Sequence, residues 1–234
     1  MNVPLPAQDS SILQIAEEEE KYYCRSDLKP SNILICDVVF KIADFGSCFR
    51  GRTEFRCTLS YSAPECDIRF QEPSLGSPHD IWSFGGILSE VVAWILGGPR
   101  EVEGFRIERY VTLVFPSLYH GNTDFGCRRG YVFLGLNSMI LAAPFYLYER
   151  GKFSISPAVD RRLEAMIKRA VEIFGPSGSK SADQVADLIK ACLIIDPYQR
   201  LTARVVADRL NEIDRSFEVV EEFDVRVLAS QGYE

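Results

Sequence analysis

The chain has 234 residues, 47% of them hydrophobic, which is enough apolar material for one large domain or two small ones with a core. Its 26 basic and 33 acidic residues give a net charge of -7, so no overall positive field exists to hold nucleic acid or anionic lipid. Seven scattered cysteines without paired C-x-x-C motifs, together with a start that is neither basic nor apolar, indicate a cytoplasmic or nuclear protein rather than a secreted one.

The first predicted elements are a helix and a small hairpin. Ile12 to Tyr23 includes the acidic run Glu17 to Glu20, which predicts a helix with a solvated face. Two short β-prone runs flank Cys36-Asp37 and predict a β-hairpin between Ile33 and Ile42. A loop rich in Gly, Arg, Ser and Thr follows, from residue 44 to residue 65.

The rest of the chain is predicted to be largely helical. His79 to Leu96 forms an apolar helix that places Trp82 in the core, and the turn residues Gly97-Gly98-Pro99 end it. Further helices are expected near residues 157–174, 181–194 and 202–215, with a capping box formed by Ser181 and Gln184 at the start of the second. Residues 110–151 have no clear pattern, and a tail begins at residue 217. The predicted fold class is mainly α with a small β-hairpin.

One uncharged run could instead be a membrane span. Tyr131 to Tyr148 has 18 residues without a charge, which is the lower limit for a membrane-spanning helix. Gly135, Asn137, Ser138 and Pro144 interrupt it, so we interpret it as core or insertion and expect no membrane association. A membrane anchor remains the alternative for this segment alone.

Chemistry is concentrated around the predicted hairpin. Asp27, Lys29 and Asn32 precede it and Asp44 follows it directly, so two acids, an amide and a lysine surround one short element. Phosphoryl transfer needs a carboxylate to orient the attacking hydroxyl, oxygen ligands for Mg²⁺ and a cation to offset charge. The structural alternative is that Asp27 and Asn32 only cap a turn.

Three motifs occur in order in this part of the chain: Asp27-Leu28-Lys29 with Asn32, then Asp44-Phe45-Gly46, then Ala63-Pro64-Glu65. Later segments fit the same pattern, namely Asp80 to Gly85, which reads D-x-W-S-x-G, and Asp196-Pro197 with Arg200. From about Ile12 to Arg215, residues 110–151 excepted, the sequence resembles the C-terminal lobe of a eukaryotic-type Ser/Thr protein kinase. Lys29-Pro30-Ser31-Asn32 is similar to the Ser/Thr form of the catalytic loop rather than the tyrosine-kinase form.

The resemblance implies ATP and Mg²⁺ as cofactors, a protein substrate, and a role for each matching residue. It implies catalysis by Asp27 with Lys29 on the γ-phosphate, metal binding by Asn32 and Asp44, and an adenine floor at Leu34. Thr58 would lie in the substrate-side loop and hydrogen-bond toward Asp27 and Lys29. Three structural residues are also implied: Glu65 and Arg200 as a buried ion pair, and Asp80 as an acceptor of backbone N–H groups from the catalytic loop.

The sequence departs from the kinase pattern in three places, one of which is the unpatterned stretch 110–151. Only 26 residues precede Asp27, and they contain no Gly-rich loop and no strand lysine, so we expect no N-terminal lobe and little activity from this chain alone. In a gapless alignment Arg25 and Ser26 replace the His and Arg of H-R-D; alternatively, Cys24-Arg25-Ser26-Asp27 is an H-R-D with one inserted residue. The expected organisation is a kinase C-lobe over residues 1–216 and a tail over 217–234. The alternative function is a pseudokinase-like interaction protein that binds a partner through the surface an N-lobe would cover.

Overall fold

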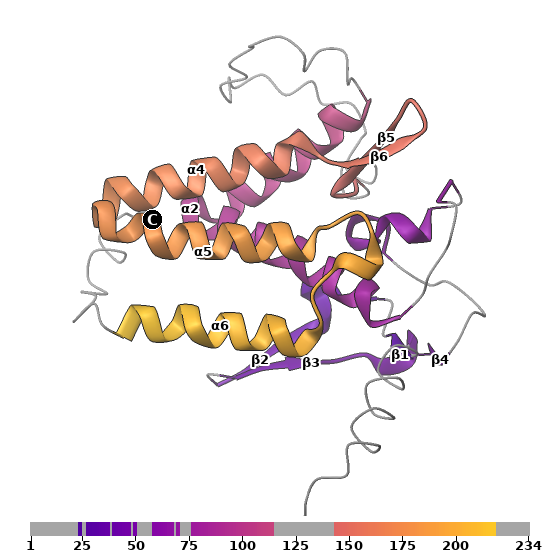
Figure 1. The fold of residues 1–234 in the computed structure, drawn as a ribbon, viewed down its shortest axis with the longest axis horizontal. Coiled ribbons are helices and arrows are strands. Elements are labelled where there is room, and N and C mark those ends of the chain that lie inside the picture. Colours follow the sequence, from indigo (N-terminus) through magenta and orange to yellow (C-terminus); the bar gives the residue numbers. More distant parts are fainter. Residues whose placement is uncertain are drawn as a thin grey trace, which may run out of the picture.

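The computed structural model describes residues 23–24, 27–37, 39–47, 49–50, 58–67, 69–70, 76–114 and 143–218. These residues form a mainly helical arrangement with small two-stranded antiparallel sheets (Figure 1). The first sheet pairs β1 (Tyr23–Cys24) with β4 (Phe49–Arg50). The helix expected from Ile12 lies outside the described residues except for Tyr23, which is in β1.

The predicted hairpin is confirmed. Strand β2 (Ile33–Cys36) pairs antiparallel with β3 (Val39–Ile42), and the register places Ile33 opposite Ile42. Asp37 forms the turn with a left-handed backbone, φ 55°, which Asp tolerates better than most residues. Residues on both strands are largely exposed, so the hairpin is held mainly by its own ladder rather than by burial.

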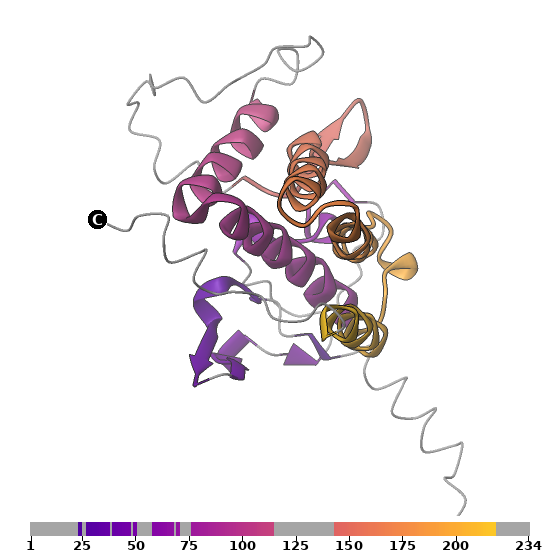
Figure 2. The same ribbon diagram turned by 90° about the vertical axis from the view of Figure 1, so that its left-hand side faces the viewer.

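The long helix α2 (Ser77–Val114) contains the predicted helix and continues beyond it. Gly97 and Gly98 leave helical geometry, and Gly98 has a φ of 68° that favours glycine, so the expected break is confirmed. The chain then resumes a helical path, and the two parts of α2 diverge at this kink (Figure 2). Pro99 is compatible with the restart because a proline is tolerated in the first turn of a helix.

The two described ends of the segment 110–151 are more regular than the sequence predicts. Its first five residues complete α2, and its end forms β5 (Tyr146–Glu149), which pairs with β6 (Lys152–Ile155) around a turn at Arg150 and Gly151. The uncharged run from Tyr131 therefore ends in a strand, while its residues up to 142 lie outside the described ones. Among the described helices, α2 is apolar and long enough to cross a membrane by composition, but 56% of that stretch is buried within the fold.

Three helices complete the fold: α4 (Pro157–Phe174), α5 (Pro176–Cys192) and α6 (Ala203–Glu218). The predicted capping box at Ser181 is wrong, because α5 begins five residues earlier. Gly175, with a φ of 68°, ends α4, and Pro176 then occupies the first turn of α5. Helix α6 includes residues 217 and 218, where the tail was expected to begin.

The core forms where α2 packs against α4 and α5 (Figure 2). Trp82 is fully buried, as predicted, and Phe145, Leu163 and Ile189 are buried in the same cluster. Gly85 and Gly86 allow α2 to approach its neighbours closely. A Cβ on Gly85 would lie 2.7 Å from Cys192 Cβ, and one on Gly86 would lie 2.7 Å from the Phe145 ring. The helices thus form a rigid platform, and the residues with chemistry lie on the segments that precede it.

Candidate active site around Asp27

Asp27 lies on an irregular segment that the fold anchors on its C-terminal side. The adjacent Leu28 is buried in the core, and one 3-10 turn, Pro30–Asn32, follows with proline at its first position. The backbone N–H of Asn32 donates to the carbonyl of Lys29 at 3.0 Å, which closes this turn. The side chains of Asp27, Lys29 and Asn32 therefore project from a short and well-anchored stretch.

The carboxylate of Asp27 is the centre of a cluster of hydrogen bonds. Lys29 Nζ donates to its Oδ2 at 2.6 Å. Thr58, 31 residues later, donates to Oδ1 from its hydroxyl at 2.7 Å and from its backbone N–H at 3.1 Å. Lys29 Nζ also reaches Thr58 Oγ1 at 3.2 Å. The expected contacts of Thr58 with both Asp27 and Lys29 are confirmed.

These contacts keep Asp27 ionised. Burial alone would raise the pKa of the Asp27 carboxyl, but hydrogen bonds from Lys29 and Thr58 and the charge of Lys29 together hold that pKa below its usual value. Asp27 is therefore a carboxylate at neutral pH, fixed in orientation and partly accessible. Such a group can orient a hydroxyl and receive its proton.

The hairpin brings Asn32 and Asp44 to the same end of one ladder. Asn32 precedes β2, Asp44 follows β3, and the backbone N–H of Ala43 donates to the carbonyl of Asn32 at 2.8 Å. The buried Asn32 donates its Nδ2 to the backbone carbonyl of Asp27 at 2.9 Å. Asp44 is exposed, with a φ of 62°, and its Oδ1 accepts from the N–H of Gly46 at 3.2 Å.

The oxygen ligands at this end of the ladder are of the kind that suits a magnesium ion. Because Nδ2 of Asn32 is used by Asp27, its Oδ1 is the free end of the amide, and among the described residues no side chain or backbone donor occupies it. An amide oxygen and a carboxylate are the oxygen ligands that Mg²⁺ prefers. Leu34, on β2, is 49% exposed and so presents an apolar surface beside these groups.

The expected ion pair between Glu65 and Arg200 is present, across 135 residues of sequence. Arg200 donates Nη1 and Nη2 to the two carboxylate oxygens at 2.5 and 2.6 Å, and both side chains are shielded from solvent. Asp80 contacts His79 Nδ1 at 3.8 Å. The bonds predicted from the catalytic loop to Asp80 stay a prediction, because residues 25 and 26 lie outside the described ones.

A second charged cluster, which the sequence did not reveal, lies next to Thr58. Three residues after Thr58, Tyr61 donates its hydroxyl to Glu90 at 2.7 Å. Arg106 and Arg109, from the second part of α2, donate to the same carboxylate. A spacing of three puts the two arginines on one face of a helix, which sequence can show, but only the kink at Gly97 turns that face toward Glu90.

Comparison with known proteins places this region in a family. Residues 20–97 match the protein kinase domain. The DYRK-family kinase pom1 of Schizosaccharomyces pombe is 38% identical over 90 residues, and the glycogen synthase kinase-3 homolog YGK3 of Saccharomyces cerevisiae is 40% identical over 76. These alignments cover 36% and 30% of this chain, and 8% and 20% of the relatives.

A longer alignment reaches beyond the matched domain. Cell division control protein 2 homolog 1 of Trypanosoma brucei brucei is 28% identical over 196 residues, which is 79% of this chain and 56% of the relative. The chain thus spans less than two thirds of the length of these kinases. Residues 20–97 are therefore similar to the eukaryotic-type protein kinase domain, and these matched residues include Asp27, Lys29, Asn32, Asp44, Thr58 and Glu65.

Proposed function

We propose that this chain is the C-terminal lobe of a Ser/Thr protein kinase and takes part in phosphoryl transfer from ATP to a protein hydroxyl. The cluster of Asp27, Lys29 and Thr58 carries the proposal. A carboxylate held ionised by a lysine and a threonine 31 residues away is more than a turn cap requires. A relative from Oryza sativa subsp. indica, the G-type lectin S-receptor-like serine/threonine-protein kinase LECRK1, is 38% identical over 89 residues and supports the same class of acceptor.

Asp27 would act on the acceptor hydroxyl. Its carboxylate orients the Ser or Thr hydroxyl and receives the proton as the oxygen forms a bond to the γ-phosphorus, while the bond from that phosphorus to the leaving oxygen of ADP breaks. Lys29, within 2.6 Å of Asp27, would offset negative charge on the transferring group. Positioning and charge compensation supply most of the catalysis in this class of reaction.

Asn32 and Asp44 would hold Mg²⁺, which, when bound, neutralises charge on the phosphates. The amide of Asn32 is already oriented by its bond to Asp27, so its oxygen needs no rearrangement to serve as a ligand. Leu34 would provide the apolar floor under adenine. The roles of these three residues follow the family pattern in which they lie.

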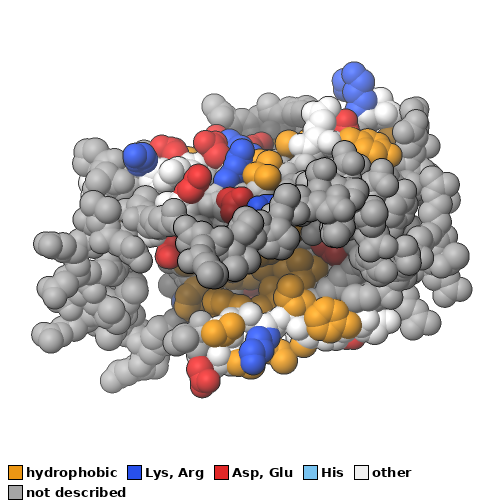
Figure 3. All heavy atoms as spheres, turned by 60° about the horizontal axis from the view of Figure 1, so that its bottom comes forward, with side chains coloured by type: hydrophobic (Ala, Val, Ile, Leu, Met, Phe, Trp, Pro, Cys, Tyr) orange, Lys and Arg blue, Asp and Glu red, His pale blue; other side chains and the backbone are white. Residues whose placement is uncertain are grey.

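The exposed face of the β2–β3 hairpin would be the surface that faces an N-lobe. Six large hydrophobic side chains on or beside the hairpin are 49% to 72% exposed: Leu34, Ile35, Val39, Phe40, Ile42 and Phe45. Hydrophobic side chains are open to solvent on this side of the molecule (Figure 3). Of these, Ile35, Phe40 and Ile42 share one face of the ladder, and exposed apolar side chains gathered in this way usually mark an interaction surface.

Activity measured with and without an N-lobe tests the proposal. We expect the 234-residue chain alone to bind Mg-ATP weakly and to transfer little phosphate, and the chain joined to a complete kinase N-lobe to phosphorylate a Ser/Thr substrate. Asp27→Asn and Asp44→Asn in the joined protein should each remove that activity, whereas Asp37→Asn, at the hairpin turn, should not. Ordinary kinase activity of the chain alone, or activity in the joined protein that survives Asp27→Asn, would refute the assignment.

A further inference from the structure

The carboxylate of Glu90 is saturated by donors from its own fold. Its Oε1 accepts from Arg106 Nε at 3.0 Å and from Arg109 Nη2 at 3.1 Å. Its Oε2 accepts from Tyr61 Oη at 2.7 Å and from Arg106 Nη2 at 2.6 Å. A carboxylate has about four acceptor sites, so Glu90 has none left for an external basic group.

The cluster also holds more positive than negative charge. Two guanidinium groups share the single carboxylate of Glu90, and the Nε and Nη1 of the buried Arg109 have no acceptor in the part of the chain that the structure describes. The rings of Phe145 and Phe105 stack on Arg109 at 3.9 and 4.7 Å, which eases its burial but does not neutralise it. Screening is weak for a buried charge, so the excess acts on whatever lies at the nearby surface.

Arg106 is the partly exposed arginine of this cluster. Its side chain is 30% exposed, while Nε and Nη2 are fixed by Glu90. The guanidinium is therefore oriented in advance, and its remaining Nη1 has no partner among the described residues. A preoriented, partly exposed arginine above a second buried one is a site for an anion.

This site lies beside the candidate active site. Thr58, which covers Oδ1 of Asp27, and Tyr61, which contacts Glu90, are the two ends of one turn around Leu59–Tyr61. At about 2 Å rise per residue in a 3-10 turn, their backbones are on the order of 6 Å apart. A peptide with its hydroxyl at Asp27 would come close to this turn, where the side chain of Leu59 is 65% exposed.

We infer that the cluster of Tyr61, Glu90, Arg106 and Arg109 selects substrates with an anionic side chain, phosphoserine above all, a few residues from the acceptor hydroxyl. The inference rests on the proposed kinase function because it treats the bound peptide as a substrate. Binding of an anionic peptide at this site does not itself require catalysis. A basic residue at the same position is disfavoured, because it would meet a filled carboxylate and an excess of positive charge.

The test measures peptide binding by the whole 234-residue chain through fluorescence anisotropy. Labelled peptides carry one serine as acceptor and, at each of about four positions on either side, phosphoserine, Glu, Ala or Lys, since an extended peptide spans about 3.4 Å per residue. At one or two positions we expect phosphoserine to bind about tenfold tighter than Ala, followed by Glu, with Lys weakest. The preference should fade as salt is added.

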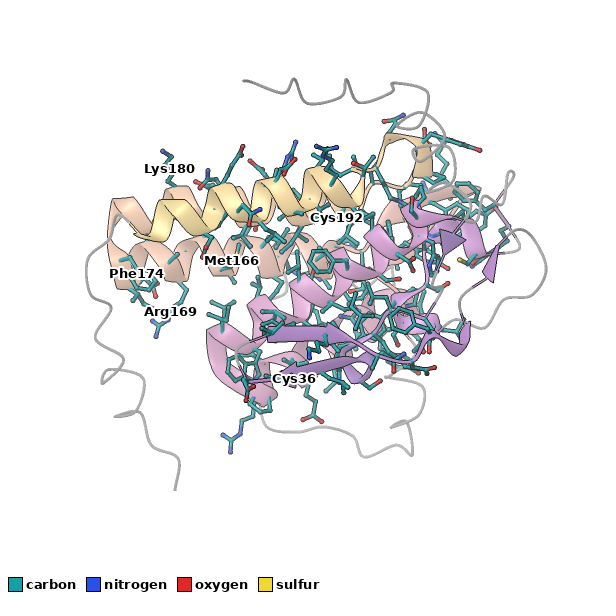
Figure 4. All side chains as sticks on the ribbon, turned by 90° about the horizontal axis from the view of Figure 1, so that it is seen from below. Cys36, Met166, Arg169, Phe174, Lys180 and Cys192 are labelled. Carbon is teal, nitrogen blue, oxygen red and sulfur yellow. The ribbon has the colours of Figure 1, made fainter. Side chains whose placement is uncertain are left out.

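Three variants distinguish a specific anion site from a general effect of charge. Arg106→Gln should remove the phosphoserine preference and Arg106→Lys should retain part of it. Arg169→Gln makes the same change of charge at an exposed arginine that points outward near the end of α4, and should leave the preference intact (Figure 4). Thermal unfolding of each variant confirms that it is folded. Equal binding of phosphoserine and Ala peptides at every position, or equal effects of Arg106→Gln and Arg169→Gln, would overturn the inference.

The sources of the anion and the two proposals are distinguished in the same experiment. Free inorganic phosphate binding as tightly as the phosphopeptide would overturn the peptide assignment. Asp27→Asn should keep the phosphoserine preference while it removes phosphoryl transfer by the joined kinase. If the parent chain shows no phosphoserine preference while the joined kinase shows Asp27-dependent transfer, only this inference is refuted. If the preference is present but Asp27-dependent transfer is absent, only the proposed function is refuted.

Discussion

Replacing Arg200 by methionine should destabilise the fold by several kcal/mol, because it leaves the carboxylate of Glu65 buried without a partner. Arg200 uses all five of its N–H donors in the structure: two on Glu65 and three on the backbone carbonyls of Pro78, Ile194 and Ile195, at 2.6 to 3.0 Å. Glu65 is fully buried. Removing one partner of a buried ion pair typically costs about 3–5 kcal/mol.

Three variants resolve this cost into its parts. Arg200→Lys keeps the charge but loses the planar fork and most of the carbonyl contacts, so its cost should be intermediate. Glu65→Gln should cost less than Arg200→Met, because it leaves no buried carboxylate unpaired. The double variant Glu65→Gln/Arg200→Met should be more stable than Arg200→Met alone, since the stranded charge is gone.

Urea unfolding followed by circular dichroism measures each free energy of unfolding. A total stability of about 5–15 kcal/mol is usual for a domain, so a loss of this size should lower the urea midpoint clearly or prevent folding. If Arg200→Met does not fold, the double variant keeps the reasoning testable, because it should recover a measurable transition. An Arg200→Met protein within about 1 kcal/mol of the parent would refute the account of a stranded buried charge.

Two further predictions concern packing and pH. Gly86→Ala should destabilise the fold by about 1–3 kcal/mol in the same assay, because the new Cβ would lie 2.7 Å from the buried Phe145 ring; Gly104→Ala, in the same helix with nothing within 4 Å, should not destabilise it. Burial raises the pKa of Glu90, but its arginine partners lower it by more, so the net pKa lies below the usual 4.5. Glu90 therefore contributes stability above about pH 4.5 that is lost as the pH falls through its lowered pKa, and Glu90→Gln should flatten the acid side of the stability profile. An unchanged acid slope in Glu90→Gln would contradict the second prediction.

Much of the candidate site could be predicted from sequence because its members are close in the chain. Asp27, Lys29 and Asn32 lie within six residues, and the two β-prone runs around Asp37 predict the hairpin that carries Asp44 back to Asn32. Spacing over so short a distance restricts the possible geometries. The long-range partners Thr58 and Arg200 came from the family resemblance, since nothing local in the sequence joins them to Asp27 and Glu65.

The tertiary structure decided what local patterns could not. A glycine pair and a proline signal the end of a helix, and they do end one, but packing against α4 lets a second helical segment start at once and reach Val114. That kink turns Arg106 and Arg109 toward Glu90. The charged cluster therefore depends on a change of chain direction that the helical periodicity of the sequence does not predict. The sequence determined which residues could do chemistry and the helices on which many of them lie. The fold determined which charges meet, because contacts between distant segments follow from packing rather than from spacing.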